Sequence, residues 1–306
     1  MKRDFITLQD YTVDEIQNLL TLSASLKKDK DQNTHHLKDK TIGLVFQKPS
    51  NRTRVSFQVA VWQLGGNCLY LGPDEINLGI RESTADVART LSRYLNGIVA
   101  RTFTHADILD LSQYASCPVI NGLSDLFHPC QAMADIFSIQ EKFQSFSGLT
   151  MAYVGDGNNV CHSLMIGCAK IGLNLNIATP RKFEPDQKIM KTALGYARKS
   201  GAKIQLTHDP KDAVKKTHII YSDVWVSMGQ EAETKKRLKI FKNFQVNAKL
   251  AALADKNYIF MHCLPAHRGQ EVTNEIIEGP HSIVFDQAEN RLHVQKAILI
   301  FLFEAR

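Results

Sequence analysis

A short polar segment with two arginines and two hydroxyl groups is the strongest chemical signal in this sequence. The segment Ser50 to Arg54 (SNRTR) lies between the apolar run Thr41 to Phe46 and the helix-like stretch Val55 to Leu64. A strand, a short turn and a helix in this order aim backbone N–H groups, hydroxyls and guanidinium groups at one point, which suits a phosphate dianion. Without a bound anion, arginines near the positive end of a helix are electrostatically unfavourable. Taken alone, a solvated basic turn explains the segment equally well.

Further polar side chains follow other short apolar runs. They are Arg101 and Thr102 after Gly97 to Ala100, His128, Cys130 and Gln131 after Val119 to Gly122, Asp223 after His218 to Ser222, and His262 and Cys263 after Ile259 to Met261. In open α/β sheets, ligands bind beyond the carboxyl ends of the strands. A lone histidine such as His128 is more often structural than catalytic. Because Arg52, Arg54 and Arg101 stand at equivalent strand ends, a role of His128 in ligand binding or catalysis is the better interpretation.

The glycine-rich turn Val154 to Asn159 (VGDGNN) superficially suggests dinucleotide binding. Its third glycine is missing, and Thr179-Pro180-Arg181 stands where an acidic residue for a ribose hydroxyl is expected. A tight turn with two asparagines at a helix N-terminus could instead bind a small carboxylate. The sequence has no GxxxxGK[ST] phosphate loop, which argues against a nucleotide triphosphatase.

Cysteine spacing predicts neither a disulfide framework nor a metal site. The six cysteines are spread along the chain, mostly in apolar surroundings, which favours reduced thiols. Cys161 and Cys263 each adjoin a histidine, but adjacent pairs lack the usual spacing of zinc ligands. We therefore expect no metal.

Two consecutive α/β units are predicted to position these side chains. Short apolar runs alternate with longer amphipathic stretches, so the strands should be parallel and joined by right-handed crossovers. The predicted strands are Thr41 to Phe46, Asn67 to Leu71, Gly97 to Ala100 and Val119 to Gly122, followed by Met151 to Val154, Leu175 to Ala178, Ile204 to Leu206, His218 to Ser222, Ile259 to His262 and Ile283 to Phe285. Helices are predicted after a capping box at Thr12 to Glu15, from Arg52, Ser83, His105 and Pro129, and over Gln287 to Ala305.

Length and composition agree with a two-domain globular protein. At 306 residues the chain is long for a single core, and the polar stretch Phe143 to Gly148 predicts domains at 1–145 and 146–287. The net charge of +6 is modest and spread, without a basic and aromatic stripe, so it suits small anionic substrates at least as well as nucleic acid, and we expect no nucleic-acid partner. No apolar run is long enough to span a bilayer, and Met1 to Asp14 is too charged for a secretory signal. A cytoplasmic location is expected.

Taken together and in order, these residues resemble the aspartate and ornithine carbamoyltransferase family over nearly the whole chain. The matching pieces are Phe46 to Phe57, Arg101-Thr102, His128 to Gln131, Gly155 to Asn159, Asp223 to Gly229, His262 to Pro265 and Glu289 to His293. The Asp-x-x-x-Ser-Met-Gly and His-Cys-Leu-Pro pieces are similar to the ornithine branch, because aspartate enzymes carry a proline where Cys263 stands. The resemblance implies two α/β domains, a cis bond at Leu264-Pro265, and a C-terminal helix (288–306) that returns to the first domain.

The resemblance also implies a set of site residues. Carbamoyl phosphate is expected to contact Ser50, Asn51, Arg52, Thr53, Arg54, Asn77, Arg101, His128, Pro129, Cys130, Gln131, Cys263, Leu264 and Arg291. L-Ornithine is expected to contact Asn159, Asp223, Ser227 and Met228. In this family the site lies between subunits of a homotrimer, and the loop of the neighbour that reaches the phosphate matches Glu75 to Gly79. Many relatives have Gln or His at the position of Asn77 and Thr at the position of Asn51.

The activity that follows from the resemblance is carbamoyl transfer from carbamoyl phosphate to the side-chain amine of ornithine, giving citrulline and phosphate. Thr53, Arg101 and His128 would stabilise the developing oxyanion, and Asp223 would anchor the amino acid without acting as a base. Cys263 is placed with the catalytic group but is expected to bind and pack, since direct transfer needs no covalent enzyme intermediate. No cofactor is expected, because carbamoyl phosphate is already activated.

Other functions remain open at this stage. Putrescine, N-acetylornithine or aspartate could be the acceptor of a related carbamoyltransferase. More distant alternatives are an NAD-dependent oxidoreductase built on the turn at Gly155, and a non-catalytic phosphate-binding regulator. A citrulline assay and a titration with NAD(P) discriminate among these classes.

Overall fold

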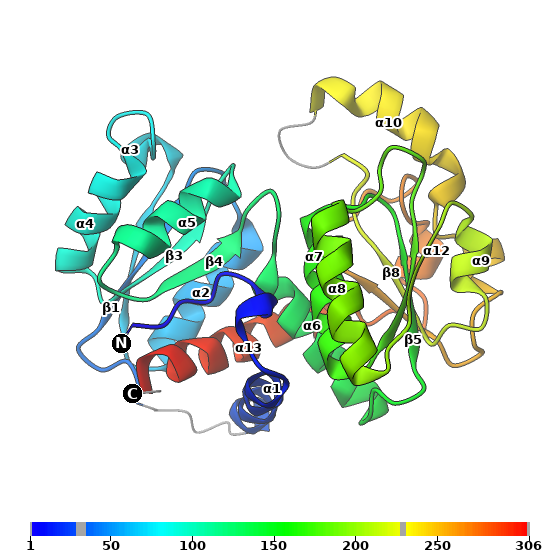
Figure 1. The fold of residues 1–306 in the computed structure, drawn as a ribbon, viewed down its shortest axis with the longest axis horizontal. Helices are drawn as coiled ribbons and strands as arrows, with labels where there is room; N and C mark the ends of the chain where they lie inside the picture. The colour runs from blue at the N-terminus through cyan, green and yellow to red at the C-terminus, as the bar shows by residue number, and fades with distance from the viewer. Residues whose placement is uncertain (1, 29–34, 227–230, 305–306) are drawn as a thin grey trace. The chain divides into compact units, whose positions relative to one another are not determined.

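The protein forms two compact units, each built on one parallel β-sheet flanked by helices (Figure 1). This computed structural model describes residues 2–28, 35–226 and 231–304. Unit 1 comprises Met1–Phe137 and Glu289–Arg306, and unit 2 comprises Ser138–Ala288. The predicted fold class is therefore confirmed. These divisions fall within two helices. The predicted domain limits at 145/146 and 287/288 lie close to them, and the assignment of a ligand to each domain stays a prediction.

Unit 1 contains a four-stranded sheet in the order β2-β1-β3-β4. The strands are β1 (Thr41–Phe46), β2 (Asn67–Leu71), β3 (Gly97–Arg101) and β4 (Val119–Leu123). The helices are η1 (Leu8–Asp10), α1 (Val13–Lys28), α2 (Asn51–Gln63), α3 (Pro73–Ile76), α4 (Thr84–Tyr94), α5 (His105–Tyr114) and the first part of α6 (Pro129–Phe143). The central strand β3 is buried at every position, as its apolar run predicts, and α4 lies beside α5 on one face of the sheet (Figure 1).

The ends of the chain complete unit 1. Phe5 pairs with Ile120 and so covers the edge strand β4. The predicted capping box is present, because Thr12 N–H donates to Glu15 Oε2 at 2.8 Å and Glu15 N–H donates to Thr12 Oγ1 at 3.2 Å. The C-terminal helix α13 (Val284–Glu304) packs on this unit through contacts such as Tyr11 with Phe301, which confirms its predicted return.

Unit 2 contains a five-stranded sheet in the order β7-β6-β5-β8-β9. The strands are β5 (Thr150–Val154), β6 (Asn174–Ala178), β7 (Ile204–Thr207), β8 (Ile219–Ser222) and β9 (Ile259–His262). The helices are α7 (Asn159–Ile171), α8 (Gln187–Ser200), α9 (Pro210–Val214), η2 (Glu231–Glu233), α10 (Thr234–Phe241), η3 (Lys242–Phe244), α11 (Ala248–Ala251) and α12 (Asn274–Ile277). Helices α7 and α8 lie side by side on one face of the sheet, and α9, α11 and α12 pack on the other (Figure 1).

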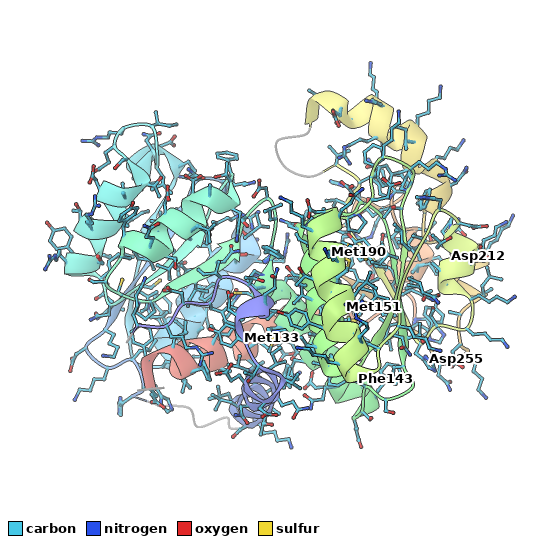
Figure 2. All side chains as sticks on the ribbon, in the orientation of Figure 1. Met133, Phe143, Met151, Met190, Asp212 and Asp255 are labelled. Atoms are coloured by element: carbon cyan, nitrogen blue, oxygen red, sulfur yellow. The ribbon has the colours of Figure 1, made fainter. Side chains whose placement is uncertain are left out.

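Each unit has its own apolar core. Met133 in α6 and Met151 in β5 are fully buried, the first in unit 1 and the second in unit 2 (Figure 2). Within the described parts of the chain, no helix is both long enough and apolar enough to cross a membrane.

The predicted strand Ile283 to Phe285 is wrong. Only Ser282 forms a bridge, with Phe260, and the chain then enters α13 at Val284. Gln287 N–H donates to the Ile283 carbonyl at 2.8 Å, which is the first turn of that helix. A three-residue apolar run fits either the start of a buried helix or a strand, so its pattern could not separate the two.

Candidate active site

The predicted site residues of each unit gather where the strand order reverses. In unit 1 the chain passes from β1 outward to β2 and then returns to β3 on the other side of β1. Phe46 is in register with Arg101, so the segment that leads into α2 starts beside Arg101. In unit 2 the corresponding reversal lies between β5 and β8, where Val154 is in register with Ser222. Such switch points are the usual ligand sites of open α/β sheets.

Helix α2 begins with the predicted anion-binding segment. Ser50 is its N-cap, and its Oγ accepts the Thr53 N–H at 3.4 Å. The first turn contains no acidic residue, so nothing in it offsets the positive end of the helix. The guanidinium of Arg54 lies 3.7 Å from the centre of the Tyr70 ring, which fixes one side of that exposed side chain.

Arg291 of α13 connects this turn to helix α6. Its Nη2 donates to Thr53 Oγ1 at 2.8 Å and its Nη1 donates to Gln131 Oε1 at 3.1 Å. The Nε2 of Gln131 donates to Asp135 at 2.8 Å. All four side chains are buried. Because a guanidinium only donates and a carboxylate only accepts, this arrangement fixes which way the Gln131 amide faces.

His128 is buried among three arginines. Burial, followed by the positive charges of Arg291, Arg101 and Arg52, holds the pKa of His128 well below its ordinary value of 6.5. The imidazole is therefore neutral at neutral pH, with one nitrogen able to donate and the other able to accept. Guanidinium groups beside a neutral donor form a pocket suited to an anion that also carries a carbonyl oxygen.

The neighbouring Pro129 and Cys130 start helix α6. Proline at the first helical position costs no hydrogen bond. The Cys130 thiol is fully buried and donates to the Asn121 carbonyl at 3.5 Å, and burial raises its pKa to about 12. That side chain therefore packs as a neutral thiol, which leaves its backbone N–H at the helix start for a ligand.

In unit 2, an amide, a carboxylate and a thiol meet beyond β5, β8 and β9. Asn158 is the N-cap of α7, and its Nδ2 donates to Asp223 Oδ2 at 2.7 Å. The thiol of Cys263 donates to Asp223 Oδ1 at 2.9 Å. Asn159 is the first residue of α7 and so adjoins this group. Asp223 is buried, and its carboxylate is held from two sides.

The glycine turn of unit 2 is covered by the chain itself. Gly157 N–H donates to the Phe183 carbonyl at 2.9 Å, and a Cβ at Gly157 would lie 2.3 Å from the Pro185 nitrogen. The backbone of 183–185 thus occupies the position from which a pyrophosphate would approach such a turn. This packing disfavours the dinucleotide interpretation.

Comparison with known proteins identifies the family. The carbamoyl-P binding domain of aspartate/ornithine carbamoyltransferases matches residues 3–141, and the Asp/Orn binding domain matches residues 147–302. The ornithine carbamoyltransferase of Thermococcus kodakarensis is 54% identical over 299 residues, which cover 97% of this chain and 95% of the relative. The chain belongs to the aspartate/ornithine carbamoyltransferase family.

Solved structures of the family agree. The ornithine carbamoyltransferase of Pyrococcus furiosus has a TM-score of 0.95 at 52% identity, covering 97% of this chain and 96% of that chain. The anabolic enzyme of Campylobacter jejuni has a TM-score of 0.94 at 38% identity, with full coverage of both chains. The family resemblance inferred from the sequence is confirmed, and the peptide bond Leu264-Pro265 is cis, as that resemblance implies.

The structure brings together much of the predicted family site within each unit. In unit 1 the residues that converge are Ser50, Arg52, Thr53, Arg101, His128, Gln131 and Arg291. In unit 2 they are Asn159, Asp223, Cys263 and Leu264. Asn77 is the C-cap of α3 in the left-handed region, with its Nδ2 donating to the Asp74 carbonyl at 3.1 Å. Ser227 and Met228 lie outside the described residues.

Three residues support the site from beside it: buried Asp135 and Glu271, which were not predicted, and half-buried Asn158, which was predicted only as a possible carboxylate ligand. Asn158 holds Asp223, Asp135 holds Gln131, and Glu271 lies 3.3 Å from the Nε2 of His262, whose Nδ1 accepts the Leu264 N–H at 2.8 Å. The sequence singled out Asn158 through the tight turn before α7, and an asparagine just before a helical stretch is also a capping signal, which the structure confirms. Asp135 and Glu271 contact the site only through other side chains, and no local pattern marks such positions.

Asp223, His262 and Cys263 also place potential metal ligands within 4.8 Å of one another. These atoms are engaged within the protein, since the Cys263 thiol donates to Asp223 and the imidazole of His262 lies between Leu264 and Glu271. The expectation that no metal is needed stays a prediction. None of the six cysteines, all of which are described, forms a disulfide.

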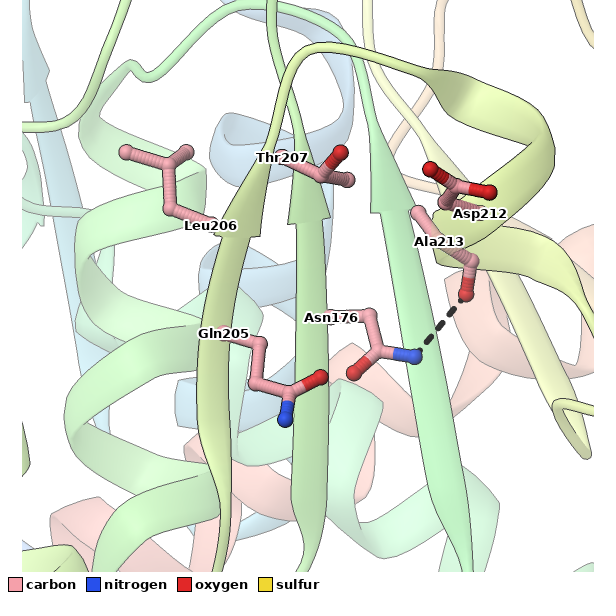
Figure 3. A pocket seen from close by; sticks show the side chains of 6 residues that line it. All are labelled: Asn176, Gln205, Leu206, Thr207, Asp212 and Ala213. Atoms are coloured by element: carbon pink, nitrogen blue, oxygen red, sulfur yellow. Dashed lines mark hydrogen bonds between the residues drawn. The ribbon is translucent and has the colours of Figure 1, made fainter.

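A separate hollow of about 320 Å³ lies at the β6 and β7 edge of unit 2. It is lined by Asn176, Gln205, Leu206, Thr207, Asp212 and Ala213. Asn176 Nδ2 donates to the Ala213 carbonyl at 2.9 Å, as Figure 3 shows. No predicted site residue lines this hollow, which lies away from the switch point between β5 and β8.

Proposed function

We propose that the protein transfers the carbamoyl group of carbamoyl phosphate to the side-chain amine of L-ornithine, giving L-citrulline and phosphate. Support comes from family membership and from relatives named ornithine carbamoyltransferase that match nearly the whole chain. The observation that carries the chemistry is the neutral His128 surrounded by Arg52, Arg101 and Arg291 at the start of two helices.

Unit 1 with the C-terminal helix is the proposed carbamoyl phosphate domain (1–145 and 288–306). The N–H groups at the start of α2 and the side chains of Ser50, Arg52 and Arg54 bind the phosphate, which leaves at the end of the reaction. Thr53, Arg101 and His128 donate to the carbonyl oxygen as negative charge develops on it in the tetrahedral intermediate. His128 acts here as a neutral donor, which agrees with its lowered pKa.

Unit 2 is the proposed ornithine domain (146–287). An alkyl amine has a pKa of about 10.4, so presenting its neutral form at pH 7 costs roughly 4 to 5 kcal/mol. Asp223 binds the α-ammonium and Asn159 the α-carboxylate, so the free side-chain amine is directed at the carbonyl carbon and proximity lowers the barrier. Cys263 keeps Asp223 in place by donating to it.

We further propose that the active enzyme is a homotrimer in which the segment Glu75 to Gly79 of one subunit completes the site of the next. The expected particle mass is three times the chain mass of 34.4 kDa, measured by light scattering. If Asn77 acts in trans, mixing an Asn77→Asp variant with an Arg101→Ala variant should restore activity that neither has alone. The cytoplasmic location stays a prediction.

The decisive experiment measures the carbamoylated product from a panel of acceptors. With carbamoyl phosphate and ornithine, the protein should form citrulline and release one phosphate for each citrulline. Putrescine, N-acetylornithine and aspartate each lack or block one of the α groups or the free amine, so their turnover should be far lower. Preference for any of them over ornithine would contradict the proposed acceptor.

A further inference from the structure

Arg237 of α10 is a buried cation that joins three segments of unit 2. Its Nη1 donates to Asp156 Oδ2 at 2.8 Å and to the Trp225 carbonyl at 2.9 Å, and its Nε lies 3.2 Å from Glu233 Oε2. The guanidinium carbon lies 4.9 Å from the centre of the Phe183 ring and 5.8 Å from that of Phe241. Arg237 is only 5% exposed, and its hydrogen bonds to Asp156 and the Trp225 carbonyl fix its orientation.

Two of these partners belong to the segments that carry the proposed ornithine ligands. Asp156 lies in the turn before Asn158, and the Tyr153 hydroxyl is 2.9 Å from the Asp156 carbonyl oxygen and 3.2 Å from Asn158 Oδ1. Asn158 in turn donates to Asp223 at 2.7 Å. Trp225 follows Asp223 by two residues. One guanidinium therefore holds the turn that carries the amides and the segment that carries the carboxylate.

The ion pair between Arg237 and Asp156 also affects the charge of Asp156, which lies near Asp223. Asp156 is 7% exposed, and burial raises its pKa to about 6, while Arg237 lowers that pKa and Asp223 raises it. Removing the cation would leave two acidic groups near each other in a buried region, with one of them lacking its counter-ion. Breaking a buried pair by removing one partner is strongly unfavourable and forces local rearrangement.

We propose that Arg237 is a positioning residue for the amino-acid substrate. By fixing the turn 155–158 against the chain after Asp223, it sets the affinity for the α-ammonium and α-carboxylate without touching the substrate. The inference rests on the proposed function, because it takes Asn159 and Asp223 as the amino-acid ligands. It predicts an effect confined to the acceptor side of the reaction.

The test compares steady-state kinetics of Arg237→Gln, Arg237→Lys and the control Lys236→Gln, which removes a charge from an exposed neighbour on the same helix. In Arg237→Gln, the KM for ornithine should rise about tenfold or more, while the KM for carbamoyl phosphate stays within about twofold. Arg237→Lys keeps the charge and should show a smaller rise. Lys236→Gln should match the wild type in both KM values.

The double variant Asp156→Asn/Arg237→Gln tests whether the rise in KM comes from the uncompensated charge of Asp156. It removes both charges, so its KM for ornithine should fall below that of Arg237→Gln. Binding of L-norvaline, which has the α groups of ornithine but no side-chain amine, should weaken in Arg237→Gln by the same factor as the KM rises.

Three results would overturn the role of Arg237: an unchanged ornithine KM in Arg237→Gln, equal rises in both KM values, or no rescue in the double variant. If Arg237→Gln does not fold, the same comparison is made with Arg237→Lys, where an unchanged ornithine KM has the same meaning. Absence of citrulline formation by the wild type would instead contradict the proposed function. The two failures are therefore distinguishable.

Discussion

At the scale of single residues, the site depends on charges whose state is set by burial. His128 keeps a pKa well below 6.5 because it is buried beside three guanidinium groups. An unfolded chain takes up that proton more readily, so His128 reduces folding stability as pH falls below about 6.5 and has no such effect above it. A neutral imidazole is thus obtained at some expense of stability in acid, as is common for groups tuned to a function.

Arg101 is proposed to donate to the oxyanion, so its removal should lower turnover. It is the last residue of β3, is 5% exposed, and lies in register with the end of β1. Removal of one donor to a developing oxyanion lowers turnover by about 10²- to 10³-fold. Arg101→Ala should show that loss in kcat with a circular dichroism spectrum like that of the wild type. A purified variant that turns over within a few-fold of wild type would reject the assignment.

Substitutions of Cys263 distinguish a hydrogen-bonding role of its thiol from a covalent one. Its thiol donates to Asp223 at 2.9 Å, and a serine hydroxyl can donate in the same way. Cys263→Ser should therefore keep substantial activity, whereas Cys263→Ala should raise the KM for ornithine by roughly tenfold through loss of a hydrogen bond to a charged group. Complete inactivity of Cys263→Ser, with both substrates still bound, would indicate a nucleophilic cysteine.

At the scale of elements, Glu15 in the first turn of α1 gives a pH-dependent prediction. Its hydrogen bond with Arg3, supported by Thr12, lowers its pKa from 4.5 to about 2. The folded state therefore holds Glu15 ionised more strongly than the unfolded state, and this stabilisation is complete above about pH 4.5 and lost as pH falls toward 2. Glu15→Gln keeps the shape of the capping box but removes the ion pair, which should cost about 0.5 to 1 kcal/mol at pH 7.

The measurement is the difference in Tm between wild type and Glu15→Gln as a function of pH. That difference should be constant near neutrality and should narrow as pH falls below about 4.5. Asp14→Asn is the matched control, because it removes an acidic group from the same turn without touching the Arg3 pair. A Tm difference that stays unchanged down to pH 3 would show that the ion pair of Glu15 with Arg3 does not stabilise the fold in this way.

Local sequence patterns predict most helices and strands of this protein but not the contacts between distant segments. Strands such as Gly97–Arg101 were predictable because a buried parallel strand is a continuous apolar run, and the starts of α2 and α4 because Ser50 and Ser83 are good N-caps. Ile283 to Phe285 failed because three apolar residues have no period. The contacts of Asn158 with Asp223 and of Arg237 with Asp156 join segments distant in sequence, and local patterns do not encode such contacts.

At the scale of the whole molecule, the two proposed substrates should each protect a different unit from amide hydrogen exchange. The proposed phosphate ligands all lie in unit 1 apart from Cys263 and Leu264, and the described ornithine ligands lie in unit 2. Inorganic phosphate should therefore slow exchange in residues 50–54 and 128–131. L-Norvaline added on top of phosphate should slow exchange in residues 157–161 and 223–225.

The assignment of the units is contradicted if the pattern is reversed, with phosphate protecting residues 157–161 and norvaline protecting residues 50–54. Arg101→Ala is the matched control on the phosphate side, since it should reduce phosphate protection at 128–131 while leaving the helix cap at Asn158 intact. Amide hydrogen exchange reports local opening throughout the full chain. The measurement therefore tests, in the intact protein, which unit binds which substrate.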